Sequence, residues 1–149
     1  YTVKLGLYAE PVGRFAVGPG NFFPPPRVDS AVIRLNRRVP LMADGAPASP
    51  EVIAAAALMA DAAFTNRRKT IANSCKTYFS GRGSILLGVA DSSAAGGAPP
   101  IALPDGAATA EHLPAIFDAA TIDSRRRGET LTQQEFLALG AALLEKAPV

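Results

Sequence analysis

Cysteine, histidine and tryptophan are almost absent from this chain. Its 149 residues include one cysteine, Cys75, one histidine, His112, and no tryptophan. A single cysteine excludes an internal disulfide framework and fits a reducing compartment, so a cytoplasmic location is expected. One histidine and one cysteine argue against a His/Cys metal site, and no motif supports a Cys/His catalytic dyad. We interpret Cys75 as a core residue and His112 as a surface residue.

Long apolar runs are also missing. No stretch approaches the roughly 18 apolar residues of a membrane span, so no membrane partner is expected, and no signal-peptide pattern opens the chain. The length suffices for one domain with a core, although many of its hydrophobic residues are alanines, which bury little area. The first residue is Tyr1 rather than methionine, which indicates a processed product or a piece of something longer.

The net charge is only +2, so the overall balance points to no particular partner. The distribution is more informative, because three short stretches, 27–38, 67–76 and 125–127, hold eleven of the fifteen basic residues and a single acid, Asp29. Clustered cations with few anions are typical of polyanion binders. Three solvated charge runs on separate surfaces would give the same pattern, and charge alone leaves both interpretations open.

Proline dominates the first quarter of the chain. Three consecutive prolines, 24–26, fix their φ angles and lack backbone donors, so they predict a stiff, extended loop with Phe22 and Phe23 at its entrance. Strands are predicted at 12–17, after Pro11, and at about 28–37. Residues 1–9 are expected to end a helix or a strand. The two strands are expected to complete a sheet whose other strands lie outside the chain.

Helical spacing and capping patterns dominate the remainder. Ser49-Pro50-Glu51 is typical of a helix start, and Thr132-Gln133-Gln134-Glu135 has the pattern of a capping box. Thr65 or Asn66 is expected to cap the second helix. The predicted helices are 52–64, a second one that runs from this cap to about 79, 111–120 and 133 to about 146. Gly, Ala, Ser and Pro enrich 81–108, and 92–100 is of low complexity, which predicts a mobile insertion.

Three separated segments resemble, in the same order, the family of small-subunit ribosomal RNA adenine dimethyltransferases. Residues 21–35, Asn-Phe-Phe-Pro-Pro-Pro-Arg-Val-Asp-Ser-Ala-Val-Ile-Arg-Leu, are similar to the family's loop beside the target-base pocket. Residues 63–74, Ala-Phe-Thr-Asn-Arg-Arg-Lys-Thr-Ile-Ala-Asn-Ser, are similar to one of its helices. Residues 122–131, Ile-Asp-Ser-Arg-Arg-Arg-Gly-Glu-Thr-Leu, are similar to its Ile-Asp-Pro-x-x-Arg-Ala-Glu-x-Leu segment. The resemblance covers only the family's C-terminal half, without its Gly-rich loop for S-adenosylmethionine or its Asn-Leu-Pro-Tyr-type motif.

The resemblance implies a mainly α fold, in which the last β-hairpin of a truncated Rossmann-like α/β methyltransferase sheet precedes a small helical RNA-docking domain. Residues 1–38 would be the remnant of the S-adenosylmethionine-dependent domain and 39–50 a linker. Residues 51–149 would form the helical rRNA-binding domain, with a flexible insertion at about 81–109, where the family usually has a tighter connection.

The intact enzyme is implied to methylate two adjacent adenines of small-subunit rRNA with S-adenosylmethionine. This piece is implied to bind rRNA and the small ribosomal subunit, to hold no cofactor and to be inactive alone. Phe22 would stack on the target adenine while Phe23 packs, and Pro24, Pro25 and Pro26 would keep the loop rigid. The implied RNA-binding residues are Arg27, Arg67, Arg68, Lys69, Lys76 and Arg127. Free backbone donors at the start of the second helix would help the Arg67–Lys69 group to bind phosphates.

Each role has a structural alternative. Phe22 would instead pack under the loop, Arg68 would form an intramolecular salt bridge, and Arg127 would pair with Glu129. Arg125 and Arg126 are interpreted as general electrostatics.

Two rival functions also remain at this point: a non-enzymatic RNA-binding or ribosome-assembly module, and a resistance-type methyltransferase of large-subunit rRNA. An exposed apolar sheet edge further predicts self-association or local disorder.

Overall fold

The computed structural model describes residues 2–88 and 100–146. The elements in this part are α1 (Thr2–Tyr8), β1 (Ala9–Val17), η1 (Pro19–Asn21), β2 (Ser30–Arg37), α2 (Pro50–Phe64), α3 (Ile71–Ser80), β3 (Ile85–Leu87), β4 (Ile101–Leu103), α4 (Gly106–Ala119), η2 (Gly128–Thr130) and α5 (Gln133–Lys146). The expectation of a mainly α fold preceded by a hairpin is confirmed. Among these residues, no helix combines the length and apolar character that crossing a membrane requires.

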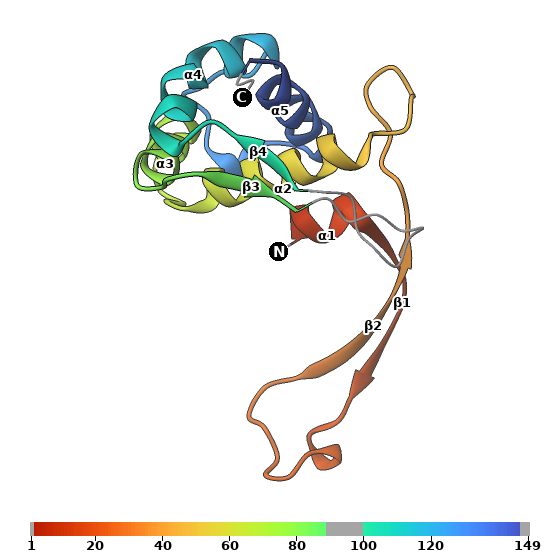
Figure 1. Ribbon diagram of the computed structural model, residues 1–149. Coiled ribbons are helices and arrows are strands. Elements are labelled where there is room, and N and C mark those ends of the chain that lie inside the picture. Colours follow the sequence, from red (N-terminus) through yellow and green to blue (C-terminus); the bar gives the residue numbers. More distant parts are fainter. Residues whose placement is uncertain (1, 89–99, 147–149) are drawn as a thin grey trace.

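Strands β1 and β2 form a two-stranded antiparallel sheet that projects away from the helices (Figure 1). The register runs from Ala9 opposite Arg37 to Val17 opposite Ser30, with a bulge between Pro11 and Gly13. The predicted strand start after Pro11 is therefore wrong, since a bulge accommodates a residue without a backbone donor. Both faces of this hairpin are open: Phe15 is 62% exposed, and Val32 and Ile33 are about half exposed.

The helices pack around a shared core in which the largest fully buried side chains include Phe79, Phe136 and Met59. Alanine-rich α2 lies against α5, and their backbones approach closely at Gly140. A Cβ there would lie 2.6 Å from the Val52 carbonyl oxygen and from the Ala56 nitrogen. Small residues on both helices are therefore what allows the contact.

Two helix starts follow the predicted caps. Ser49 Oγ accepts a hydrogen bond from the Val52 nitrogen at 3.3 Å, and α2 begins at Pro50. Thr132 Oγ1 accepts from the Glu135 nitrogen at 3.2 Å, and Glu135 Oε2 accepts from the Thr132 nitrogen at 2.7 Å. This reciprocal pair is the predicted capping box.

The starts of α3 and α4 differ from the prediction. Thr70, rather than Thr65 or Asn66, caps α3: its Oγ1 accepts from the Asn73 nitrogen at 3.4 Å. Helix α4 begins at Gly106, five residues before the predicted position, because Asp105 Oδ1 accepts from the Ala108 nitrogen at 2.9 Å. Gly106 also sits against the carbonyls of Phe79 and Arg82, where no side chain fits.

The predicted mobile insertion contains a second small sheet. Strands β3 and β4 pair antiparallel, with Ile85 opposite Leu103, and Ile85, Leu87 and Leu103 are buried. The strand at 101–103 was not predicted, because three residues carry too little pattern. The low-complexity stretch 92–100, apart from Pro100, lies outside the described residues.

The N-terminal segment is tied to the helices. Leu7 of α1 is fully buried beside Ile53 and Leu137, and Lys4 Nζ pairs with Asp61 Oδ2 at 2.8 Å. Arg38, at the base of the hairpin, donates to the Gly6 carbonyl at 3.2 Å and to Gln133 Oε1 at 2.7 Å. Helix α1 thus packs with the helical part, while the division at 38 and 50 stays a prediction.

Candidate nucleic-acid interface

Three exposed cations, Arg67, Arg68 and Lys69, stand on the turn between α2 and α3. The backbone of this turn is held from both sides. Thr65 Oγ1 donates to the Asp61 carbonyl at 3.0 Å, and Ser74 Oγ donates to the Asn66 carbonyl at 2.9 Å. The sequence predicted these cations on the helix itself, which is wrong because α3 begins only at Ile71. They project instead from a fixed turn.

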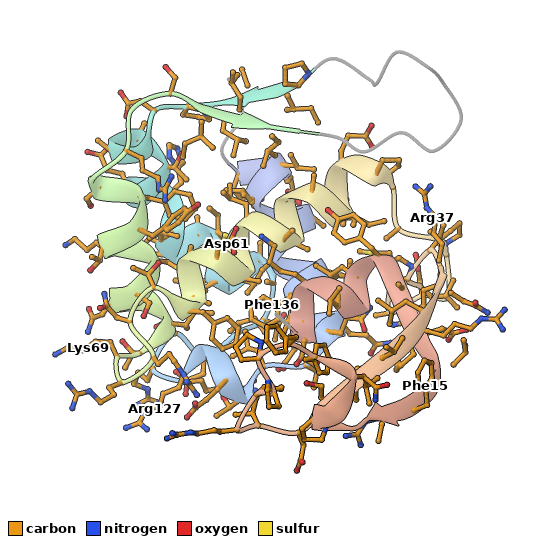
Figure 2. The ribbon with its side chains drawn as sticks, turned by 90° about the horizontal axis from the view of Figure 1, so that it is seen from below. Phe15, Arg37, Asp61, Lys69, Arg127 and Phe136 are labelled. Atoms are coloured by element: carbon orange, nitrogen blue, oxygen red, sulfur yellow. The ribbon has the colours of Figure 1, made fainter. Side chains whose placement is uncertain are left out.

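A second basic segment lies beside this turn. The Ile71 nitrogen donates to the Arg126 carbonyl at 2.7 Å, and the Ala72 nitrogen donates to the Ser124 carbonyl at 3.2 Å. The following Gly128 is buried against the end of α2, where a Cβ would lie 2.9 Å from Ala63 Cβ and 3.0 Å from the Ala63 oxygen. These contacts bring together the basic junction, by which we mean Arg67, Arg68, Lys69 and Arg127. Figure 2 shows Lys69 and Arg127 at one margin of the molecule and Arg37 on the other side.

Glu129 lies between two cations of the basic junction. One of its carboxylate oxygens is 4.0 Å from Arg67 Nη2 and the other 4.0 Å from Arg127 Nη1. All three side chains are largely exposed, and pairs of this length in water are weak. The predicted Arg127–Glu129 contact is therefore present, yet it leaves the guanidinium accessible. Among the described residues, no ion pair involves Arg68 or Lys69, so the salt bridge considered for Arg68 is not formed there.

Arg126, the neighbour of Arg127, has a different role. Its guanidinium binds the Glu135 carboxylate and donates to the Thr130 carbonyl at 2.6 Å. This Arg126 contact, together with the Thr132 backbone donor, holds the pKa of Glu135 below its ordinary value. The interpretation of Arg126 as general electrostatics is thus wrong, because it fastens the loop that carries Arg127 to the start of α5. In the sequence, the carboxylate of Glu135 in the predicted capping box was the signal that could have identified a partner for Arg126.

The start of α3 does not offer free backbone donors. The Ile71 and Ala72 nitrogens bind the carbonyls of the neighbouring loop, and the Asn73 nitrogen binds Thr70 Oγ1. The expectation that free backbone donors at this helix start would help to hold a phosphate is therefore wrong, whereas phosphate contact by the cations themselves stays a prediction.

The loop between β1 and β2 is built on a short turn, with Asn21 Nδ2 donating to the Gly18 carbonyl at 3.0 Å. Phe22 is 44% exposed and Phe23 is 101% exposed, so the expected packing of Phe23 does not occur within the described chain. The three prolines follow, of which Pro26 is half-buried, and then the exposed Arg27. Among the described residues, no hydrogen bond or ion pair joins this loop to the helices, and the far end of the hairpin projects away from them (Figure 1).

Fold and surface together define a helical domain with a cationic junction, joined to a hairpin that carries an aromatic loop. The chain is 34% identical over 143 residues to ribosomal RNA small subunit methyltransferase A of Myxococcus xanthus, covering 95% of this chain and 39% of that protein. Proteins of the same name from Geobacillus sp. and Anaeromyxobacter dehalogenans are 33% and 35% identical, again over 95% of the chain. No protein-family model matches it.

These relatives confirm the resemblance to small-subunit rRNA methyltransferases that the three motifs indicated. The chain spans about two-fifths of the length of the relatives that it matches. The match is consistent with the C-terminal portion of that family.

Proposed function

We propose that this chain is the rRNA-binding portion of an enzyme that methylates small-subunit rRNA, and that the basic junction is its contact with the RNA backbone. The observation that carries the proposal is the packing of Gly128 against Ala63, which places Arg127 beside the Arg67–Lys69 turn. Residues 60 positions apart in sequence thereby contribute to one cationic surface. The names of the relatives, all of which refer to the small subunit, support rRNA of that subunit and disfavour a large-subunit target.

The chemistry of the basic junction suits a phosphate backbone. Of its four cations, only Arg67 and Arg127 approach a carboxylate, that of Glu129, and both do so at 4.0 Å, so the surface keeps an excess of positive charge. Guanidinium groups bind phosphate oxygens in pairs, and the loss of counterions from RNA drives such binding. Because the backbone of the turn is already fixed by Thr65 and Ser74, little ordering is needed when RNA binds.

Phe22 belongs to the same proposal as the ring that stacks on an extruded adenine in the whole protein. It is partly exposed at the tip of the hairpin, as a stacking ring has to be. Residues Pro24–Pro26 restrict the backbone beside it. The target, two adjacent adenines, comes from the resemblance and is tested only with the full enzyme.

S-adenosylmethionine is the methyl donor that the family resemblance implies for the whole protein. The described residues do not fit it, because both sheets in this part are antiparallel pairs and neither feeds a glycine-rich turn into a helix. The cofactor would be held by parts of the whole protein outside this chain, and the chain alone is proposed to be inactive. Methyl transfer to assembled small subunits by the isolated 149 residues would overturn that proposal. The same result would also exclude the alternative of a non-enzymatic RNA-binding module.

A salt titration of binding to small-subunit rRNA tests the basic junction. For single-stranded contacts, log affinity falls with log salt by about 0.7 per phosphate, so the double variant Arg67→Gln/Arg68→Gln should flatten the slope by about 1.4. The matched control is Arg14→Gln/Arg37→Gln, two exposed hairpin arginines without ion pairs among the described residues. Equal slopes for both double variants would refute the basic junction as the RNA contact.

Self-association through the hairpin is a further part of this proposal. Strand β1 pairs only with β2 among the described residues, and Phe15 and Ile33 are exposed on the hairpin. Open edges of this kind favour pairing with another chain. Sedimentation velocity should show a mass that rises with concentration, and a monomer at every concentration would refute it. The cytoplasmic location, like this pairing, stays a prediction.

A further inference from the structure

A groove runs between α3 and α4 and opens toward the basic junction. It consists of two adjoining hollows of about 680 and about 480 Å³ that share Asn73, Lys76 and Ser80. The smaller hollow extends to Asn66 and Lys69, at the turn that carries the junction. The groove is thus continuous with the surface proposed to contact RNA.

The two walls of the groove differ in chemistry. The α3 wall, by which we mean α3 together with the turn before it, presents Lys69 from the turn and Asn73 and Lys76 from the helix, and all three are exposed. The α4 wall presents Ala107, Ala110 and Pro114, with the carboxylates of Glu111 and Asp118 beside them. Among residues 2–88 and 100–146, none of the ion pairs joins these lysines to either carboxylate. The lysines of one wall and the carboxylates of the other are therefore not paired with each other, and both are available to a molecule in the groove.

Buried side chains form the floor. Leu113, Phe117 and Ile122 line the larger hollow and are 4%, 3% and 7% exposed. These residues belong to the core of the helical part, so the floor is fixed. An occupant would rest on a firm apolar base between a cationic wall and a wall with hydrogen-bond acceptors.

We propose that this groove binds unpaired nucleotides of the same RNA strand that crosses the basic junction. The inference rests on the proposed function and extends its contact surface. The phosphates lie along the α3 wall, where Lys76 and Lys69 are their counter-charges. A base lies across the alanines and Pro114 of α4, where the Glu111 and Asp118 carboxylates accept hydrogen bonds from its amino or ring N–H groups. A duplex would keep these donors paired, so single-stranded RNA is the form that fits.

Lys76→Gln is the test of the phosphate contact. A slope of about 0.7 per phosphate means that one phosphate contact strengthens binding about fivefold when the salt is lowered from 1 M to 0.1 M. A variant that loses this one contact should therefore bind single-stranded oligoadenylate about fivefold more weakly at 0.1 M salt. Arg37→Gln, which also removes one positive charge but lies on the side of the molecule away from Lys69 (Figure 2), should leave affinity unaltered. In the 149-residue chain, oligoadenylate should shift the backbone amide NMR signals of Asn73, Lys76 and Ala110.

The outcomes separate this inference from the proposed function. If Arg67→Gln/Arg68→Gln weakens binding but Lys76→Gln equals Arg37→Gln, and the groove amides stay still, the groove proposal is wrong and the basic junction stands. If the junction variant is also without effect, both fail. If oligoglutamate shifts the groove amides and oligoadenylate does not, the groove is a site for an acidic peptide and the nucleotide proposal is overturned.

Discussion

Gly128→Ala probes the contact that assembles the basic junction. Gly128 is buried, and an added Cβ would lie 2.9 Å from Ala63 Cβ, 3.0 Å from the Ala63 oxygen and 3.2 Å from its carbonyl carbon. Two of these three atoms are helix backbone, which cannot rotate away. In the variant, η2 and the end of α2 therefore have to separate by a few tenths of an ångström.

The expected cost follows from this geometry. Overpacking of a close contact destabilises by about 1–3 kcal/mol, while replacing glycine lowers the entropy of the unfolded chain and returns about 0.4–1 kcal/mol. The net loss should be about 1–2 kcal/mol, which changes the folding equilibrium about 5- to 30-fold. Arg127 should also move away from the Arg67–Lys69 turn, so the RNA affinity should fall although no charge has changed.

Urea denaturation is the assay, because the midpoint reports stability while an unchanged m-value shows that the same surface unfolds. Gly83→Ala is the matched control, since nothing lies within 4 Å of a Cβ there. The Gly128→Ala midpoint should fall clearly below that of the control. Coincident midpoints, or a loss of stability without any loss of RNA affinity, would refute the account of how the junction is assembled.

Three further predictions concern the helical part. The pKa of Glu135 is lowered in the folded chain, so its ionised carboxylate contributes stability above the ordinary pKa of 4.5, and this contribution is lost as the pH falls toward the folded pKa. In a profile of urea midpoints between pH 3 and 7, Glu135→Gln should therefore reduce the fall in stability at acid pH. Thr132→Ala should cost about 1 kcal/mol in the same measurement at pH 7, because the α5 cap is lost; an unaltered midpoint would contradict the cap. Burial raises the pKa of Cys75 to about 12, so at pH 8 the thiol should react with a chromogenic disulfide only in urea; rapid reaction without urea would show that the core opens there.

Local patterns predicted the elements whose signals are local. Ser49-Pro50 and the Thr132–Glu135 box gave the starts of α2 and α5, since a cap is decided within four residues. Where several capping residues compete, the pattern did not decide. Thr65, Asn66 and Thr70 all suit the start of α3, and the choice fell to Thr70 because Ser74 holds Asn66 in the preceding turn.

The candidate site was predictable in composition but not in assembly. The sequence named Arg67, Arg68, Lys69 and Arg127, yet it could not show that they share a surface, because the contact between Gly128 and Ala63 spans two distant segments. Arg126 and Arg127 illustrate the same limit. They are identical and adjacent, and only the position of Glu135 in the folded chain makes one structural and leaves the other accessible.

The anchorage of the hairpin has a mechanical consequence. Its base is fastened by Arg38 to α1 and α5, whereas its far end has no such tie among the described residues. The eight residues of β2 span about 26 Å at 3.3 Å per residue, so a tilt of about 5° at the base displaces the far end by about 2 Å. A slight rocking of the helical body would therefore move the aromatic tip by about that distance, which is enough to bring the proposed stacking of Phe22 on a base into or out of reach.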